Sequence, residues 1–469
     1  MKKREKLIYA LGDLFGGGAQ SLVSVVYLFF LNTFVGLNIA LAGTVVLISR
    51  FWDAISDPLM GVISDNTRTK IGRRRPYILV GGFLIALIFA LMWLPIGGWE
   101  SDLGKFIYVL ATYILYSTVS TVIAVPYNSY SAEITTDVQE RNNVNLLRMV
   151  VSSISTALCT LIPSTVLDLY KGGDINQTVF YLIIGVGFGV FYAIPLIMVG
   201  LFTKERTPVP ETKSVFHMNT FVKPLRLKAF RGLVYMYLAQ SIAMDVLAAG
   251  IVYFAYYVAG VGTTILLGSF VAAQLLMFPF IQKLLKKVDK RKIYYFGLPL
   301  AIVSFIGVGL YQTEWPVVIL YLLNALTAVG FTGAMMMSWI IFPDVVDAGD
   351  LLNKERPTGS YSGIMTFIRK TASAIAIFLF GILLSLFGFV NPTSDMTGLP
   401  DQPDLAILGI RVAMVGTAVL LMFLGFLVAR TFVLTNRRSK QIQTFLQQRT
   451  DGLLDETDPE LKQLISEIS

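Results

Sequence analysis

Charged residues are scarce in this sequence. Only 14% of its 469 residues are Asp, Glu, Lys or Arg, whereas 55% are hydrophobic. A soluble chain of this composition would need several domains whose cores consume nearly every residue. Apolar runs of roughly 20 residues, the length that crosses a bilayer as a helix, instead recur from one end of the chain to the other. The composition therefore predicts an all-α membrane protein.

Cysteine and histidine each occur once, as Cys159 and His217. A single cysteine excludes an internal disulfide, and the pair does not support a His/Cys metal site. The glycines of 16–18 and of 185–189 neither follow a strand nor precede a Lys-Ser/Thr pair, so close helix packing explains them better than a phosphate-binding loop. Since no nucleophile and base pattern is present either, we expect no enzyme, no ATP-driven pump and no cofactor.

The apolar segments predict about twelve transmembrane helices. They lie near 7–34, 39–63, 77–95, 104–130, 144–167, 178–202, 231–258, 262–285, 293–312, 316–342, 359–388 and 405–434. The net charge of +8 is concentrated in the loops on one side, which indicates orientation in a membrane rather than nucleic-acid binding. By the positive-inside rule, both termini and the central linker are cytoplasmic. We therefore expect a multi-pass protein of the cell membrane, with its first span retained because no cleavage site follows it.

A linker rich in proline divides the spans six and six, and each half carries a basic loop after its second span. This pattern is typical of an internally repeated transporter. It predicts an N-terminal six-helix bundle (1–202), a cytoplasmic linker (203–230), a C-terminal six-helix bundle (231–438) and a polar, partly helical tail (439–469).

Two aspartates lie within the second span. Asp53 and Asp57 are four residues apart and thus share one helix face, which must turn to the bundle interior. Two carboxylates held together repel each other unless a cation or a proton lies between them, which predicts an ion-coupling site. The alternative is that both form structural salt bridges with Arg50, Arg73 or another basic residue.

Charges in the second half give further candidates. Lys370 is deep enough in span eleven to reach the interior and neutralise the aspartates, whereas we expect the adjacent Arg369 to extend to the cytoplasmic interface. Asp245 is the only charge deep in span seven, so it is either a substrate contact or half of a buried pair.

The remaining candidates lie in the first half. Asp13 is either a pore residue or a partner for a cytoplasmic base, and Arg148 either holds a substrate oxygen or closes a cytoplasmic network. Tyr127 and Asn128 suit a polyol, although aromatic residues in spans more often pack. Gln20 completes the group of residues that we expect to face the substrate.

Several motifs along nearly the whole chain resemble the glycoside-pentoside-hexuronide:cation symporter family of the major facilitator superfamily. They are Tyr9-Ala10-Leu11-Gly12-Asp13, Trp52-Asp53-Ala54-Ile55-Ser56-Asp57-Pro58, Gly72-Arg73-Arg74-Arg75-Pro76, Val125-Pro126-Tyr127 with Arg141 and Arg148, the Pro343–Asp350 segment and Lys370. The resemblance implies the major facilitator fold.

The resemblance also implies roles for individual residues. Asp53 and Asp57, with Thr121 and Ser56, would bind the cation, which would be Na⁺ if the chain is sodium-coupled. Lys370 would lie nearby and Arg148 close to the substrate. The gate would comprise acidic residues of a cytoplasmic loop after span ten and basic residues elsewhere: Asp344, Asp347, Asp350, Arg141 and Arg73. A solvated acidic loop is the alternative for the carboxylates.

The sequence also departs from a sugar-binding member of that family. Gly17 and Ala124 stand where two sugar-binding aspartates are expected, Asn128 replaces a stacking tryptophan, and Ser56 replaces a cation-site asparagine. Sodium or proton coupling stays open, although the retained carboxylate pair favours sodium.

Together these features predict a monomeric secondary transporter that couples Na⁺ or H⁺ to a sugar or glycoside by alternating access. Its partners would be the solute and membrane lipids, with no nucleic acid. The alternatives are a symporter of lysophospholipids or other amphiphiles and, as a more distant class, a non-transporting membrane sensor.

Overall fold

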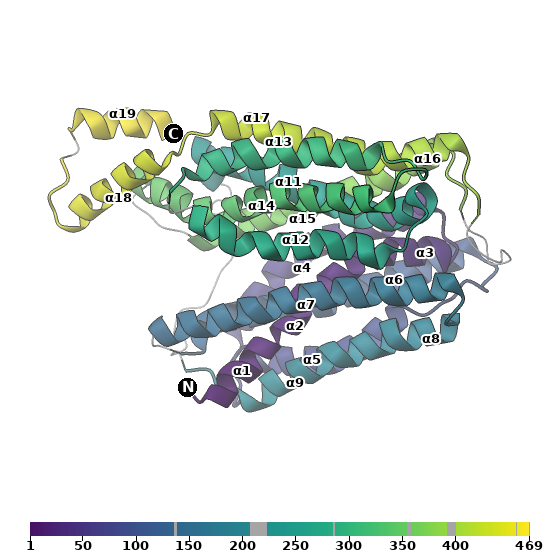
Figure 1. Cartoon of the computed structure of the whole chain (residues 1–469). Helices are drawn as coiled ribbons and strands as arrows, with labels where there is room; N and C mark the ends of the chain where they lie inside the picture. Colours follow the sequence, from purple (N-terminus) through teal and green to yellow (C-terminus); the bar gives the residue numbers. More distant parts are fainter. Residues whose placement is uncertain are drawn as a thin grey trace. The chain divides into compact units, whose positions relative to one another are not determined.

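The computed structural model describes residues 1–135, 138–206, 223–284, 287–353, 358–391, 400–455 and 457–468. Every regular element within these residues is helical (Figure 1). Twelve of the described helical stretches are long and apolar enough to cross a membrane, which confirms the predicted number of spans.

The first six spans are formed by α1 (Lys3–Leu11), α2 (Asp13–Leu22), the π-helical turn η1 (Val23–Tyr27) and α3 (Leu28–Thr33), then α4 (Ile39–Asn66), α5 (Arg75–Met92), α6 (Asp102–Glu133), α7 (Val138–Gly172), and finally α8 (Gln177–Tyr181), η2 (Leu182–Gly187) and α9 (Phe188–Phe202). The other six are formed by α11 (Lys228–Tyr253) with η4 (Phe254–Ala259), α12 (Thr263–Leu284), α13 (Lys290–Gly309), α14 (Val317–Asn353), α15 (Thr358–Leu386), and α16 (Asp404–Arg411), η5 (Val412–Gly416) and α17 (Thr417–Thr431). A short 3₁₀ turn, η3 (Lys223–Arg226), precedes α11.

The chain forms two compact units. The first unit comprises Met1–Phe216, Ala248–Leu267 and Ile377–Ile410, and the second comprises His217–Leu247, Gly268–Ala376 and Arg411–Ser469. The first unit thus contains all of the first six spans and short pieces of spans seven, eight, eleven and twelve. The division into four segments derived from the sequence stays a prediction.

Glycines let the helices of the first unit approach closely. A Cβ atom on Gly17 would overlap the Ser152 hydroxyl and the Ser152 carbonyl oxygen, and one on Gly18 would overlap Ser155 and Cys159 of α7. In a membrane, lipid is as apolar as the helix surfaces, so the hydrophobic effect does not drive helices together. Close packing does, and small residues permit it by letting the two backbones approach. The packing interpretation is therefore correct for Gly17 and Gly18, whereas a Cβ on Gly16 would meet only Asp13 of the same helix.

Helix α14 is longer than the sequence predicted. The apolar pattern ends at residue 342, but the helix continues for eleven further residues to Asn353. Asp344 and Asp350 therefore lie on a helix, and the predicted cytoplasmic loop directly after span ten is wrong. Hydropathy marks where a span leaves the membrane and not where its hydrogen-bonded backbone ends.

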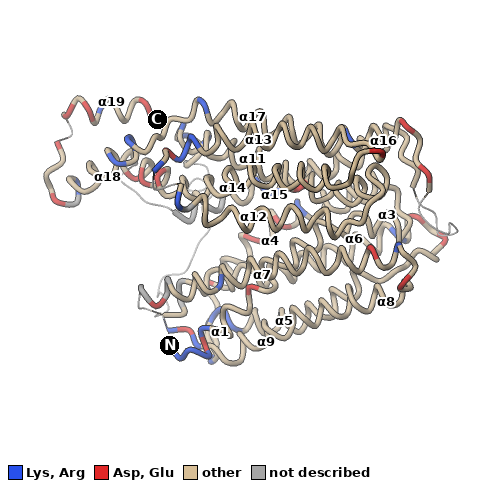
Figure 2. Tube along the Cα trace, viewed as in Figure 1, with Lys and Arg blue, Asp and Glu red and all other residues tan. Residues whose placement is uncertain are grey.

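Lys and Arg gather at the end of the first unit that carries the N-terminus (Figure 2). In the second unit, two polar helices follow the last span, α18 (Asn436–Thr450) and α19 (Pro459–Ile468). The prediction of a polar, partly helical tail agrees with these helices.

Candidate functional site: a carboxylate pair on α4

Asp53 is buried on the face of α4 that packs against α6, with 4% of its surface exposed. The Ser117 hydroxyl of α6 donates a hydrogen bond to its Oδ1, while Arg50, one turn earlier on α4, donates from Nη1 to its Oδ2 at 3.2 Å. The alternative that the two aspartates form structural salt bridges is thus observed for Asp53, which pairs with Arg50.

Asp57 lies one turn further along the same face and is half-buried. The Thr121 hydroxyl of α6 donates to its Oδ1 at 2.7 Å. Because Ser117 and Thr121 are also four residues apart, each carboxylate of α4 meets one hydroxyl of α6 at matching height. Ser56 lies between the aspartates, and its hydroxyl is 3.5 Å from the Asp53 carbonyl oxygen.

A second polar group lies where α1, α2, α6 and α7 meet. Arg148 Nε is 3.7 Å from Asp13 Oδ2, and the guanidinium lies over the Tyr127 ring at 5.6 Å. Tyr127 and Tyr9 stack at 4.9 Å, and each hydroxyl donates to the other residue's carbonyl oxygen, at 2.6 and 3.2 Å. Of the alternatives for Asp13, the basic partner is the one observed.

The guanidinium of Arg148 has unused donors. Its Nε and Nη1 atoms are buried without a hydrogen-bond partner in the described part of the chain. A buried donor without an acceptor costs free energy, so a solute oxygen or a water would stabilise this group.

The other substrate-facing candidates of the first half are separated. Asn128 is exposed near the C-terminal end of α6. Gln20 is exposed on α2, donates to Ser24 at 3.1 Å and lines a cavity of about 20 Å³ together with Tyr27 and Arg50. A cavity of that size holds about one water. At Gly17, Ser152 of α7 fills the space that an aspartate side chain would need.

Asp245 and Arg369 meet in the second unit. Arg369 Nη2 lies 3.3 and 3.5 Å from the two carboxylate oxygens of Asp245, joining α11 to α15. The prediction that Arg369 extends to the interface is wrong, because the buried carboxylate of Asp245 holds its guanidinium inside the unit. Lys370 follows on α15 and is half-buried.

The acidic residues predicted to gate the chain are tied to other helices of the second unit. Lys290 Nζ and the Ser439 hydroxyl reach Asp344 Oδ2 at 2.7 and 2.9 Å, and Arg449 Nη2 reaches Asp350 Oδ1 at 2.5 Å. The solvated acidic loop is therefore wrong. Asp347 is half-buried on the same helix, and the Arg141 side chain lies outside the described residues.

Arg73, the remaining gating candidate, lies just before α5 and is buried. Its backbone N–H donates to Glu205.

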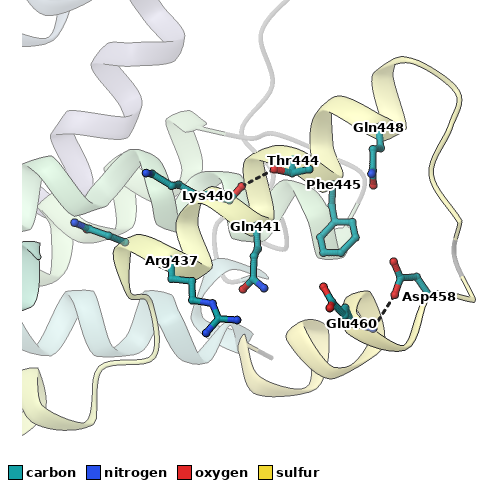
Figure 3. Close-up of a pocket in the computed structure, with 9 residues that line it drawn as sticks. Arg437, Lys440, Gln441, Thr444, Phe445, Gln448, Asp458 and Glu460 are labelled. Carbon is teal, nitrogen blue, oxygen red and sulfur yellow. Dashed lines mark hydrogen bonds between the residues drawn. The ribbon is translucent and has the colours of Figure 1, made fainter.

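The C-terminal tail forms a groove of about 600 Å³ between α18 and α19 (Figure 3). Basic Arg437 and Lys440 line one wall, and acidic Asp458 and Glu460 line the other.

Ser117 and Glu205 were not predicted from the sequence. A serine on a helix has many uses, so only its place four residues before Thr121 could have identified Ser117 as an Asp53 partner. Arg50 was named only as a structural partner, although its spacing of three residues from Asp53 already puts the two on one face.

Twelve spans, a buried and a half-buried carboxylate that face hydroxyls, and a half-buried guanidinium are typical of a secondary transporter. A family model described as MFS/sugar transport protein matches residues 8–436, and the chain belongs to this family of major facilitator transporters. It is therefore a transporter of the glycoside-pentoside-hexuronide type and not an enzyme, as the motifs predicted.

Two relatives and one solved structure illustrate the family. The chain is 24% identical to the isoprimeverose transporter of Lactiplantibacillus pentosus, over 82% of this chain and 81% of that protein. It is 25% identical to the sodium-dependent lysophosphatidylcholine symporter 1-A of Danio rerio, over 92% and 87%. The inward-open xylose transporter XylE of E. coli has the same fold, with a TM-score of 0.61, 13% identity and coverage of 92% and 96%. The chain is accordingly a multi-pass membrane symporter of the major facilitator superfamily.

Proposed function

We propose that this symporter couples a cation, preferably Na⁺, to a sugar or glycoside by alternating access, as a monomer in the cell membrane with both termini in the cytoplasm. Asp53 and Asp57 are the coupling carboxylates. Ser117, Thr121 and Ser56 complete the cation site, and Arg148 binds the solute with Tyr127, Asn128, Gln20, Asp245 and Lys370 as further contacts. The chain folds as an N-terminal bundle (1–202) and a C-terminal bundle (231–438). The cytoplasmic gate comprises Asp344, Asp347, Asp350, Arg141 and Arg73.

The observation that supports this proposal most is the matched pairing of α4 carboxylates with α6 hydroxyls. Carboxylate and hydroxyl oxygens are the ligands that a hard monovalent cation prefers, and the pairs present them from two adjacent helices. Since Arg50 contacts Asp53, the cation competes with a guanidinium for that carboxylate. Cation binding then weakens the contact between Arg50 and Asp53.

Coupling follows from charge. Without the cation, Asp57 adds a second negative charge to the half-buried face of α4, and moving that face into a closed interior is costly. With the cation bound, the net charge of the site falls and closure around the solute becomes favourable. The name of the isoprimeverose transporter supports a sugar as that solute.

The test is the uptake of a panel of glycosides by membrane vesicles that contain the Asp57→Asn variant. We expect loss of uptake driven by a sodium or proton gradient, with substrate exchange or binding partly retained, because the amide removes the charge but keeps the shape. If this variant keeps uptake with its full cation dependence, Asp57 does not bind the coupling cation.

A lysophospholipid is the second candidate solute, because a sodium-dependent lysophosphatidylcholine symporter aligns with 92% of this chain. The absence of an aspartate at Gly17, where the helix contact leaves no room for a side chain, agrees with a solute that has fewer hydroxyl groups. Thermal-shift measurements with sugars and with lysophospholipids, each with and without Na⁺, separate the two.

A further inference from the structure

Asp168, at the end of α7 away from the basic loops, caps a helix of the second half of the chain. Its Oδ1 accepts from the Thr263 backbone N–H at 2.9 Å and from the Thr263 hydroxyl at 2.8 Å. Its Oδ2 accepts from the backbone N–H and hydroxyl of Thr264 at 2.9 and 2.6 Å. Thr263 is the first residue of α12, so these N–H groups have no partner within their own helix.

Two further contacts fix this carboxylate. The Tyr256 hydroxyl donates to its Oδ1 at 2.8 Å, and Lys171 Nζ lies 3.5 Å from the centre of the Tyr256 ring. Gly262 brings the α12 backbone to the carboxylate, because a Cβ there would lie 3.0 Å from Asp168 Oδ2. One carboxylate therefore accepts five hydrogen bonds from a segment about 90 residues away in sequence.

Asn391 makes the reverse connection. It follows α15 in the second half, and its Oδ1 accepts from the Ile39 backbone N–H at 3.1 Å and from Asn32 Nδ2 at 2.8 Å. Ile39 is the first residue of α4, whose next N–H, that of Ala40, is capped by Asn38. A Cβ on Gly381 of α15 would lie 2.7 Å from the Ile39 carbonyl oxygen, so the two backbones are close.

The two connections are related by the internal repeat of the chain. Helices α4 and α12 are the second and eighth spans, and α7 and α15 are the fifth and eleventh. In each half, the N-terminus of the second span is thus capped by a side chain at the end of, or just after, the fifth span of the other half. All of these residues belong to the first unit.

We propose that Asp168 and Asn391 form a reciprocal helix-cap latch that holds the outer ends of the two halves together and must open for the solute to enter from outside. The inference rests on the alternating-access cycle proposed above. Backbone N–H groups at a helix start are well suited to such a latch, because water replaces the caps when they separate and no internal helix bond breaks. Tyr253 and Tyr256, which pack on Phe29, give the same end an apolar seal.

Thiol labelling tests the latch without any solute. Cys159 is the single native cysteine and is buried, so Cys159→Ser gives a background for Leu28→Cys, whose position is 3% exposed and lines the interior cavity. A membrane-impermeant maleimide is applied to intact cells. Asp168→Ala should raise the labelling rate by on the order of tenfold or more, since it removes hydrogen bonds to a charged acceptor. Asn391→Ala, which removes a neutral acceptor, should raise it by roughly fivefold.

The controls separate the caps from general effects. Asp174→Asn removes a charge from an exposed residue just after α7 and should leave labelling unchanged. Asn391→Asp keeps an oxygen for Ile39 and should behave as the parent. Asp168→Asn keeps Oδ1 for Thr263, loses the acceptor of Thr264 and should give an intermediate rate; it serves in place of Asp168→Ala if that variant does not fold.

Labelling that is equal in the parent, Asp168→Ala or Asp168→Asn, and Asn391→Ala would overturn the latch. An increase seen only in inside-out vesicles would also overturn it, since the capped ends would then face the cytoplasm. Because labelling needs no transport, failure of the coupling proposal, measured with Asp57→Asn, is distinguishable from failure of the latch.

Discussion

Thr121 donates a 2.7 Å hydrogen bond to Asp57 from one helix turn beyond Ser117, the residue that donates to Asp53. The hydroxyls of α6 thus hold both carboxylates of α4 from the same side. If those oxygens surround a cation, the hydroxyls both orient the carboxylates and supply ligands of their own.

We predict that Ser117→Ala and Thr121→Ala each raise the cation concentration for half-maximal substrate binding by about two- to tenfold, equivalent to the roughly 0.5–1.5 kcal/mol of one hydrogen bond. The double variant should lose more than the sum, since both hydroxyls serve one site. Cation titration of gradient-free substrate binding measures the effect.

Thr118→Ala is the matched control for the hydroxyl series. Thr118 lies on the same helix, between the two residues, but accepts from Trp52 Nε1 rather than contacting an aspartate. Its removal should leave the cation titration unchanged. A shift as large as that of Thr121→Ala would assign the effect to α6 as a whole.

Gly17→Ala should lower the thermal unfolding temperature and the yield of folded protein. The added methyl overlaps Ser152 of α7, and overpacking of a close contact costs about 1–3 kcal/mol. Gly61→Ala in α4 is the control, since a Cβ there meets nothing within 4 Å and alanine favours a helix by about 1 kcal/mol. If both variants unfold at the temperature of the parent, the α2 and α7 backbones are further apart than described.

The number of spans and the face shared by Asp53 and Asp57 could be predicted from sequence, because bilayer thickness fixes the length of a span and helix geometry fixes the face. Partner choice could not. Arg369 pairs with Asp245, which is more than 120 residues away in the sequence. The residues around either position do not predict a contact over that separation. The end of α14 was missed for a related reason, since its last turns are stabilised by ion pairs to Asp344 and Asp350 rather than by lipid.

The Asp245–Arg369 pair gives a prediction that separates a structural role from a solute contact. Asp245→Asn leaves a half-buried guanidinium without its carboxylate and should destabilise the protein by about 3–5 kcal/mol, whereas Asp245→Asn with Arg369→Gln should recover most of that loss. Thermal unfolding in detergent measures the stability. Solute affinity that remains low in the stable double variant would assign Asp245 to the binding site, and restored affinity would assign it to the scaffold.

Glu205 provides the last prediction, because one side chain there holds the start of α5. Its carboxylate accepts from the backbone N–H groups of Arg73, Arg74 and Arg75 at 2.9, 2.8 and 3.1 Å. Gly72, with φ +119°, leaves the space for this approach.

In return, the Arg75 side chain donates to the Gly200 and Leu201 carbonyl oxygens at the end of α9, at 3.0 and 3.1 Å. A carboxylate at a helix start and a guanidinium at a helix end both complement the helix dipoles. Glu205→Ala should therefore cost about 1–3 kcal/mol of stability, and Glu205→Gln, which keeps one acceptor oxygen, should cost less. Thermal unfolding of both variants checks the order. Equal and small shifts would mean that Arg75 alone joins α5 to α9, in which case Arg75→Lys, which loses the forked geometry of the guanidinium, should show the larger loss.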